Sequence, residues 1–545
     1  MDVDGEGESP HGGTLISRRR LLAAGAMAGT AAVLAACSNT PSSSPVTAPT
    51  LAPPVASSGP TVRSVTAAPP SLGPDRDSSM KVENLIPGDD RWDRMRAPSG
   101  VSAYLAAPSV GPGEPLSLRA QGSGFVDVEW YRLGWYDGLG GRLIKVDRHV
   151  RLSKQPRATI DNVTGLVEAH WTPVLQTTAP SGVKSGMLLA VLRSPKGHSI
   201  ANVPIVLRPD PTDPQRAPIL FVSAAATWQA YNAWGGLDLY SNVYNHPVAA
   251  TANHRAAQVS FDRPYALDSG AGFLRRWELQ FIRWMERNGR DVEYIADVDL
   301  ERNPDLANGR RMLVMAGHPE YWTRPMRSRV EAAVAAGTNV AFLTANEVYW
   351  QARLEDGPAG PGTRITSYKS KTADPIMVTR PDLTTCRWRE APVNDPEAPL
   401  VGQMYGRIVE RVADWIVTNH GHWLYEGTDL RDGDAISNLV GQEYDTFFPD
   451  LAQPGTVQLA HSPVNAVRSS NHDPGAYPSA PIHTSTMYTA QSGATVFAAG
   501  TFQWSWAIDD YGSRDYKGVR TPIDDRVGRM TANLFDRLGD GPLAP

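Results

Sequence analysis

Residues 312–350 read MLVMAGHPEYWTRPMRSRVEAAVAAGTNVAFLTANEVYW, and this stretch decides the fold class. Residues 312–315 are a continuous apolar run, which is typical of a strand buried on both faces. The helix predicted over about 325–336 begins after Thr323, a favourable N-cap, and stops at a glycine. The apolar run 340–344 follows as a second strand. A strand, a helix and a strand in this order predict two parallel strands joined by a crossover helix.

The same alternation extends toward the N-terminus. The apolar run 219–223 predicts another buried strand, and a strand is also expected at 292–295. Between them, residues 273–288 have the spacing of an amphipathic helix, with an apolar face made of Trp277, Phe281, Trp284 and Met285. The region 213–545 is therefore predicted to be an open α/β domain of glutamine-amidotransferase or flavodoxin-like type, with helices on both faces of its sheet.

Residues 96–212 have a different pattern, made of short β-runs separated by glycine and proline. The clearest runs are 116–120, 126–131, 186–192 and 203–207. Alternation with turn signals at these intervals predicts an antiparallel β-sandwich, here of immunoglobulin-like type. A short segment rich in Asp and Pro at 210–214 joins this sandwich to the α/β domain.

Residues 1–36 are typical of an export signal. Ser17–Leu22 reads SRRRLL, which fits a twin-arginine box, and an apolar run rich in alanine and glycine follows it. That run ends directly before Cys37, in the pattern of bacterial lipoprotein signals. We therefore expect twin-arginine export, acylation of Cys37 and anchoring at the outer face of the cytoplasmic membrane. The alternative is a plain secretory signal. Residues 37–95 are predicted to be a disordered linker, since their first half is mostly Ser, Pro, Thr and Ala.

The composition excludes several classes of protein. The 545 residues carry a formal net charge of −5, and no basic patch interleaved with aromatic residues is present, so nucleic acid is not expected as a partner. After the signal, no apolar run is long enough to span a bilayer. The sequence has two cysteines, so acylation of Cys37 would leave Cys386 alone and exclude an intramolecular disulfide.

Polar side chains follow three of the four predicted strands of the α/β domain. The first strand is followed by Tyr231 and Tyr240, the third by His318 and Glu320, and the fourth by Asn346. Ligands of open α/β sheets bind beyond the carboxyl ends of the strands, so these side chains are expected to share one cleft. The alternatives are that the tyrosines serve packing and that the other groups are solvated loop residues.

Other motifs point less clearly to chemistry. His420 and His422 lie in a polar stretch without a partner cluster, which favours a surface loop. Asp297 and Asp299 have the D-x-D spacing of some metal-assisted transferases but are expected to end a strand. Cys386 has no histidine partner in view, which argues against a cysteine nucleophile. A nucleophile elbow, an H-E-x-x-H motif and a Gly-rich phosphate loop are all absent from the sequence.

Seven short strings across roughly 98–540 resemble the large subunit of the N,N-dimethylformamidase family. They are YRLGWY at 131–136, YNAWGG at 231–236, FDRPY at 261–265, GHPEYW at 317–322, NEVYW at 346–350, GQEYD at 441–445 and AGTFQWSW at 499–506. The resemblance implies a hydrolase of a small amide with a single iron, Fe³⁺ favoured, held by two tyrosines and one glutamate. It also implies a cytoplasmic enzyme with a small partner subunit, from which an exported lipoprotein departs.

Carried over residue by residue, the resemblance implies a specific ligand set. Glu320 would be the carboxylate ligand, and Tyr240 and Tyr231 would be the phenolates, with Tyr265 as a rival for the second of these. The groups beside the substrate would be His318 and Asn346, with Glu443 as a more distant acidic partner. Hard anionic oxygen ligands suit a hard trivalent ion, and such a site would activate water for attack on an amide carbonyl.

Two further functions remain open from the sequence. One is a non-enzymatic envelope protein that binds a glycan or a small ligand between aromatic walls formed by Trp228, Trp234, Trp350, Trp504 and Trp506. The other is a different hydrolase or transferase on the same scaffold, because fold does not determine function. The oligomeric state is also open, with a homo-oligomer and a complex with a small subunit as the alternatives.

Overall fold

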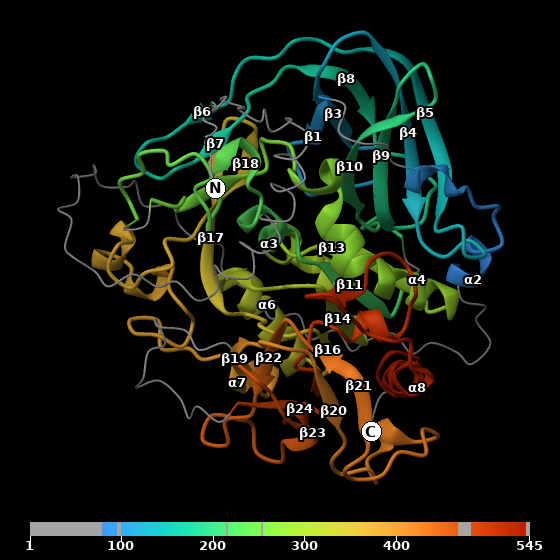
Figure 1. Ribbon diagram of the computed structural model, residues 1–545, viewed down its shortest axis with the longest axis vertical. Coiled ribbons are helices and arrows are strands. Elements are labelled where there is room, and N and C mark those ends of the chain that lie inside the picture. The colour runs from blue at the N-terminus through green and yellow to red at the C-terminus, as the bar shows by residue number, and fades with distance from the viewer. Residues whose placement is uncertain (1–78, 95–99, 214–215, 252–253, 467–480, 541–545) are drawn as a thin grey trace, which may run out of the picture.

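The computed structural model describes residues 79–94, 100–213, 216–251, 254–466 and 481–540 (Figure 1). The predicted signal peptide, Cys37 and the first part of the predicted linker lie outside these residues. Within the described part of the chain, no helix combines the length and apolar character needed to cross a membrane.

The N-terminal domain is a sandwich of two sheets, as predicted. The smaller sheet has the order β1 (Ser102–Leu105), β3 (Pro115–Gln121) and β8 (Pro173–Thr178). The larger sheet has the order β2 (Ser109–Val110), β10 (Ser199–Leu207), β9 (Gly186–Arg193), β4 (Phe125–Leu133) and β5 (Gly141–Arg151). A single apolar core joins the two sheets, since Leu118 of β3 belongs to the same buried cluster as Trp130 of β4 and Ala190 of β9. A short hairpin of β6 (Thr159–Ile160) and β7 (Val167–Glu168) extends from the sandwich.

The second domain is built on a seven-stranded sheet. Its order is β13 (Val292–Ala296), β11 (Ile219–Ser223), β14 (Met312–Ala316), β16 (Asn339–Leu343), β25 (Thr495–Ala498), β24 (Ile482–Thr489) and β23 (Val457–Pro463). The first five strands are parallel, which confirms the predicted α/β domain, whereas β24 runs antiparallel to both of its neighbours, β25 and β23. The chain leaves β11 to one side for β13 and returns on the other side as β14, so the topological switch point lies between β11 and β14.

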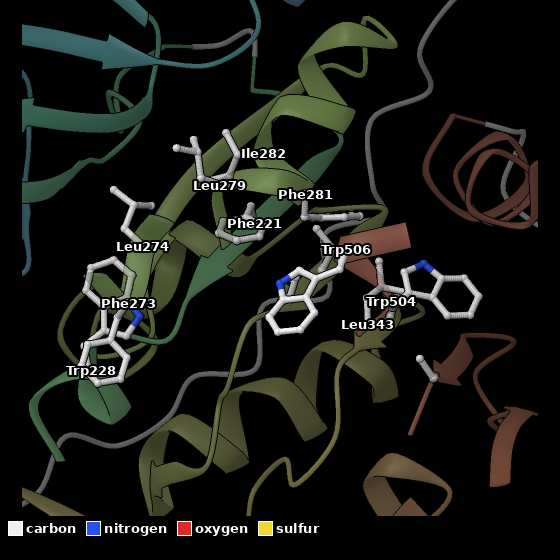
Figure 2. Packing of buried hydrophobic residues seen from close by; sticks show 14 of the residues in the cluster. Phe221, Trp228, Phe273, Leu274, Leu279, Phe281, Ile282, Leu343, Trp504 and Trp506 are labelled. Atoms are coloured by element: carbon white, nitrogen blue, oxygen red, sulfur yellow. The ribbon is translucent and has the colours of Figure 1, made fainter. Parts of the chain in front are cut away.

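Helices cover both faces of this sheet. On one face lie α4 (Leu279–Arg287), entered through a π-helical turn (Leu274–Glu278), and α8 (Asp525–Leu534). Figure 2 shows Phe221 of β11 and Phe281 of α4 in this core, with ring centroids 6.2 Å apart. The other face carries α6 (Arg324–Ala335), which begins at the predicted N-cap Thr323.

A smaller sheet lies beside the carboxyl ends of the parallel strands. Its order is β12 (Gln258–Ser260), β18 (Gly360–Thr366), β17 (Trp350–Gly357) and β15 (Tyr321–Thr323). The remaining short elements are α3 (Ala225–Ala230), α5 (Asp299–Arg302), α7 (Ala398–Val401) and the strand pairs β19 (Met404–Ile408) with β22 (Glu443–Thr446), β20 (Ala413–Ile416) with β21 (Ala435–Val440), and β26 (Asp515–Tyr516) with β27 (Val519–Arg520).

The end of the predicted linker is part of the folded domain. Residues 79–94 form α2 (Ser79–Glu83) and a 3₁₀ turn (Asp90–Asp93), although the sequence pattern assigned them to a disordered tract. Trp92 is buried and donates to the carbonyl of Leu139 at 2.9 Å. Asn84 donates to the carbonyl of Glu286 at 2.9 Å, which ties this segment to α4. The segment is ordered because it buries these groups against both domains.

Candidate functional site

Two tyrosines follow β11 and stack on each other. Tyr231 is the C-cap residue of α3 and is buried, while the half-buried Tyr240 lies in a turn where Asp238 accepts hydrogen bonds from two backbone N–H groups. The two rings are nearly parallel, with centroids 4.2 Å apart. Their hydroxyl groups therefore meet at one place beyond the carboxyl end of β11.

His318 and Glu320 follow β14, the neighbouring strand at the switch point. Gly317 permits the turn because its φ is +93°, in the region that favours glycine. The backbone N–H of Glu320 donates to Thr227 Oγ1 of α3 at 3.1 Å, which joins the two strand ends.

Glu320 is the centre of the site and is fully buried. Its Oε1 accepts a hydrogen bond from Tyr240 at 2.6 Å, and its Oε2 accepts one from Tyr231 at 2.8 Å. His318 Nε2 lies 3.1 Å from Oε2 and 3.3 Å from the Tyr231 hydroxyl. The structure thus brings together four of the residues that the sequence singled out.

The site holds a charged pair inside the protein. Burial would raise the pKa of Glu320, but His318 and Lys369 hold it below its ordinary value. Burial would lower the pKa of His318, yet Glu320, with smaller effects from Glu443 and Asp445, raises it. Each of these two groups therefore favours the charged form of the other.

Asn346 lies on a loop with unusual backbone geometry. Asn346 and Val348 have φ of +58° and +52°, and the left-handed region is strained for a β-branched residue such as valine. Asp445 Oδ1 accepts the N–H of Asn346 at 2.9 Å, and Glu443 Oε2 accepts its side-chain Nδ2 at 2.7 Å. Burial raises the pKa values of Glu347 and Asp445, whose carboxyl groups share a hydrogen bond. These contacts hold Asn346 in place.

Two residues of the site were not assigned from the sequence. Lys369 Nζ lies 3.1 Å from the centroid of the Tyr240 ring, and this lysine is buried. Tyr321 donates from its hydroxyl to the Tyr240 oxygen at 2.6 Å. Tyr321 follows Glu320 directly, which was a usable signal, whereas the local sequence around Lys369 contains none.

Other candidates are placed away from the site. The Tyr265 hydroxyl lies beside the Gln229 side chain, whereas the Tyr231 hydroxyl donates to Glu320. Trp504 and Trp506 are fully buried in the core, where their indole N–H groups donate to Thr531 and to the Arg276 carbonyl. These two residues therefore do not form an open aromatic wall.

The remaining sequence motifs have structural roles. Asp297 accepts backbone N–H groups from Ala226 and Val298, and Asp299 accepts the N–H of Ala296. His422 accepts the N–H of Leu424 in a surface turn, and His420 pairs with Asp432. Cys386 is buried, and burial raises the pKa of its thiol to about 12, which makes it a poor nucleophile.

The donor set fits a metal that prefers oxygen. No three His, Cys, Asp or Glu side chains among the described residues are arranged to hold a metal ion, so tyrosine oxygens would have to complete a site. The two phenol oxygens lie 2.6 and 2.8 Å from the Glu320 oxygens. Oxygen ligands about 2.0–2.2 Å from a metal lie about 2.8–3.1 Å apart when adjacent. The 2.8 Å separation falls at the short end of this range and the 2.6 Å separation just below it, so it is the chemistry of the donors that suits a hard cation.

The comparisons with known proteins all identify similarity to the same family. A family model described as "N,N-dimethylformamidase beta subunit-like, C-terminal" matches residues 127–518. The chain is 22% identical over 457 residues to an N,N-dimethylformamidase beta subunit from Alcaligenes sp, and 22% identical over 453 residues to one from Paracoccus aminophilus. Each match covers 70% of this chain and 56% of the relative, so the chain spans about half the length of these curated relatives.

Proposed function

Because the chain belongs to the N,N-dimethylformamidase beta subunit-like family, we propose that it is an iron-dependent hydrolase of a small amide or another C–N bond. The observation that carries the proposal is the convergence of Tyr231 and Tyr240 on the two oxygens of Glu320. In this proposal the three side chains hold one iron, with Fe³⁺ favoured because all three donors are hard oxygens. When bound, the iron supplies Lewis acidity toward a carbonyl oxygen and toward water.

The residues around this set provide complementary polar groups. His318 Nδ1 and Asn346 Oδ1 are buried without a hydrogen-bond partner among the described residues. One nitrogen that can donate and one oxygen that can accept match the carbonyl and the amine portion of an amide. A positioned donor of this kind stabilises the developing oxyanion by about 3–4 kcal/mol.

Proton transfer to the leaving amine needs a second group. Glu443 lies behind Asn346, whose Nδ2 donates to it at 2.7 Å. In the proposed reaction Asn346 orients the substrate, and Glu443 or His318 carries the proton to the departing nitrogen. Phe502 packs against the His318 ring with centroids 4.5 Å apart and limits access of water.

Localisation and assembly extend the proposal. We infer export by the twin-arginine pathway and lipid anchoring through Cys37, supported by the sequence pattern SRRRLL and its spacing from the cysteine. The relatives are named as beta subunits, which supports a partner subunit for this chain, with a homo-oligomer as the alternative. We also propose that the N-terminal sandwich is immunoglobulin-like and that the α/β domain is flavodoxin-like.

The test is metal analysis of the purified full chain after expression with iron, together with its visible absorption spectrum. About one iron per chain is expected, with a phenolate-to-iron charge-transfer band. Tyr240→Phe should weaken the band and Glu320→Ala should abolish iron binding. Tyr265→Phe is the matched control and should change neither, because its hydroxyl lies beside Gln229 and not beside Glu320.

The outcomes separate the two parts of the proposal. A colourless protein without iron would overturn the metal site. An iron-loaded protein that hydrolyses none of a panel of formamides, acetamides and other small amides would overturn the hydrolase assignment and leave the metal site standing.

A further inference from the structure

We propose that Tyr321 is a positioning residue that holds the oxygen of Tyr240 and weakens its donation to the metal. This inference rests on the proposed function, because it concerns the same ligand set. It adds a third tyrosine, whose hydroxyl acts through Tyr240 rather than by binding the metal or the substrate.

The geometry around Tyr321 supports this role. Its hydroxyl donates to the Tyr240 oxygen at 2.6 Å, and the Tyr240 hydroxyl donates in turn to Glu320 Oε1 at 2.6 Å. The Tyr321 and Tyr240 rings meet edge to face, at 84° with centroids 6.3 Å apart. Tyr321 therefore approaches Tyr240 from the side, whereas Tyr231 stacks on the Tyr240 ring.

Tyr321 is held more firmly than the residue it contacts. It is the first residue of β15, pairs in register with Trp350 of β17, and is fully buried. Tyr240 is half-buried and lies in a turn outside any strand. A hydrogen bond between a fixed strand residue and a turn residue restricts the turn residue, so Tyr321 sets the position of the Tyr240 oxygen.

Two buried cations also draw electron density from Tyr240. Lys369 Nζ lies over the Tyr240 ring at 3.1 Å from its centroid. Arg255 is buried and interacts electrostatically with both Tyr321 and Tyr240. A hydrogen-bond donor and two positive charges draw electron density from the Tyr240 oxygen, so this oxygen is a weaker donor than an isolated phenolate would be.

The consequence can be measured on the iron-loaded full chain with Tyr321→Phe. Without the hydrogen bond the Tyr240 oxygen donates more strongly, so the charge-transfer band should move to longer wavelength and the Fe³⁺/Fe²⁺ potential should fall. Loss of a group that orients a ligand typically weakens metal binding by about 10–100-fold. This loss of positioning should outweigh the stronger donation of the Tyr240 oxygen. The iron dissociation constant, measured by competition with a chelator, should therefore rise by that factor while saturating iron still gives one ion per chain.

A double-mutant cycle separates positioning from general structural support. If Tyr321 acts through Tyr240, then adding Tyr321→Phe to Tyr240→Phe should leave the iron dissociation constant of the single Tyr240 variant unchanged. Tyr265→Phe is the matched control for loss of a tyrosine hydroxyl outside the proposed ligand set. This cycle remains informative if Tyr321→Phe alone lowers protein stability, because the comparison is made within one background.

Three results would overturn the inference. The first is an unshifted charge-transfer band in Tyr321→Phe. The second is a loss of band intensity as large as that of Tyr240→Phe, which would make Tyr321 a ligand. The third is an equal effect of Tyr321→Phe on the iron dissociation constant with and without the Tyr240 hydroxyl. Absence of iron from the wild-type protein would instead be a failure of the proposed function.

Discussion

The wild-type protein should lose folding stability as the pH rises toward neutrality, and Glu278 should cause a large part of this loss. Replacing Glu278 with glutamine should therefore make the free energy of unfolding less dependent on pH. Glu278 is fully buried beneath α3, where its Oε2 accepts from Ser223 Oγ at 2.7 Å. Its Oε1 accepts from the N–H of Ala224 at 2.9 Å and from the indole N–H of Trp228 at 3.1 Å. Glutamine has the same shape, and its amide can keep these three contacts without a charge.

The size of the effect follows from the pKa of Glu278. Burial raises this pKa from 4.5 to about 8, although the three hydrogen bonds oppose the increase. A raised carboxyl pKa contributes stability that is present below the unfolded value and is lost as the pH rises toward the folded value. Since one pKa unit corresponds to about 1.36 kcal/mol, the wild-type protein should lose about 2.5 kcal/mol between about pH 5.5 and about pH 7.5 through this group.

Urea titration followed by tryptophan fluorescence at the two pH values measures this difference. The free energy of unfolding of Glu278→Gln should fall by about 2.5 kcal/mol less than that of the wild type over the same interval. Glu410→Gln, which removes an exposed carboxyl group, is the matched control and should follow the wild type. Parallel curves for wild type and Glu278→Gln would show that Glu278 is ionised in the folded protein and would refute the reasoning.

Three other changes have defined expectations. In the wild type the buried Glu286 pairs with Arg132 at 2.9 Å. Arg132→Ala leaves Glu286 without its cation and should lower the free energy of unfolding, measured in urea, by about 3–5 kcal/mol. A loss below about 1 kcal/mol would contradict this. Asp445→Ala should lower kcat for amide hydrolysis by about 10²-fold with the iron content unchanged, because it removes the oxygen that accepts the N–H of Asn346; loss of iron in this variant would show a role in the metal site instead. Cys37→Ser should move the protein from the membrane fraction to the soluble fraction, and unchanged fractionation would contradict lipid anchoring.

The central part of the α/β sheet could be predicted because its local signals agree. The strand and helix between 312 and 336 have an apolar run, the N-cap Thr323 and the glycine at 337, and the structure contains all three features. The antiparallel strand β24 was missed because its buried face is polar. It includes Ser485, which is buried and donates to the carbonyl of Ala498. Such hydrogen bonds offset the cost of burying polar side chains, so this buried strand lacks the apolar pattern from which a strand is predicted.

The structured segment 79–94 was missed for a related reason. Its composition is polar, and only Met80 and Trp92 are buried apolar residues in it. Its order depends on partners that are distant in the sequence, such as Glu286, whose carbonyl accepts from Asn84. Contacts of this kind leave no periodic pattern in the segment itself.

The residues of the candidate site come from two parts of the fold, the ends of the central parallel strands and other segments of the domain. Tyr231, Tyr240 and Glu320 follow β11 and β14, the two strands at the topological switch point, so a rule about strand ends was enough to predict that they share one cleft. Their proposed role as metal ligands came from the family resemblance. Lys369 follows β18 of the smaller sheet and Glu443 begins β22, so neither could be assigned by that rule. The proposed ligands, together with His318 and Asn346, thus belong to the general geometry of an open α/β sheet, whereas Lys369 and Glu443 come from added segments. Under the proposed function, substitution of Glu443 should therefore alter substrate handling while the iron stays bound, whereas substitution of Glu320 should remove both.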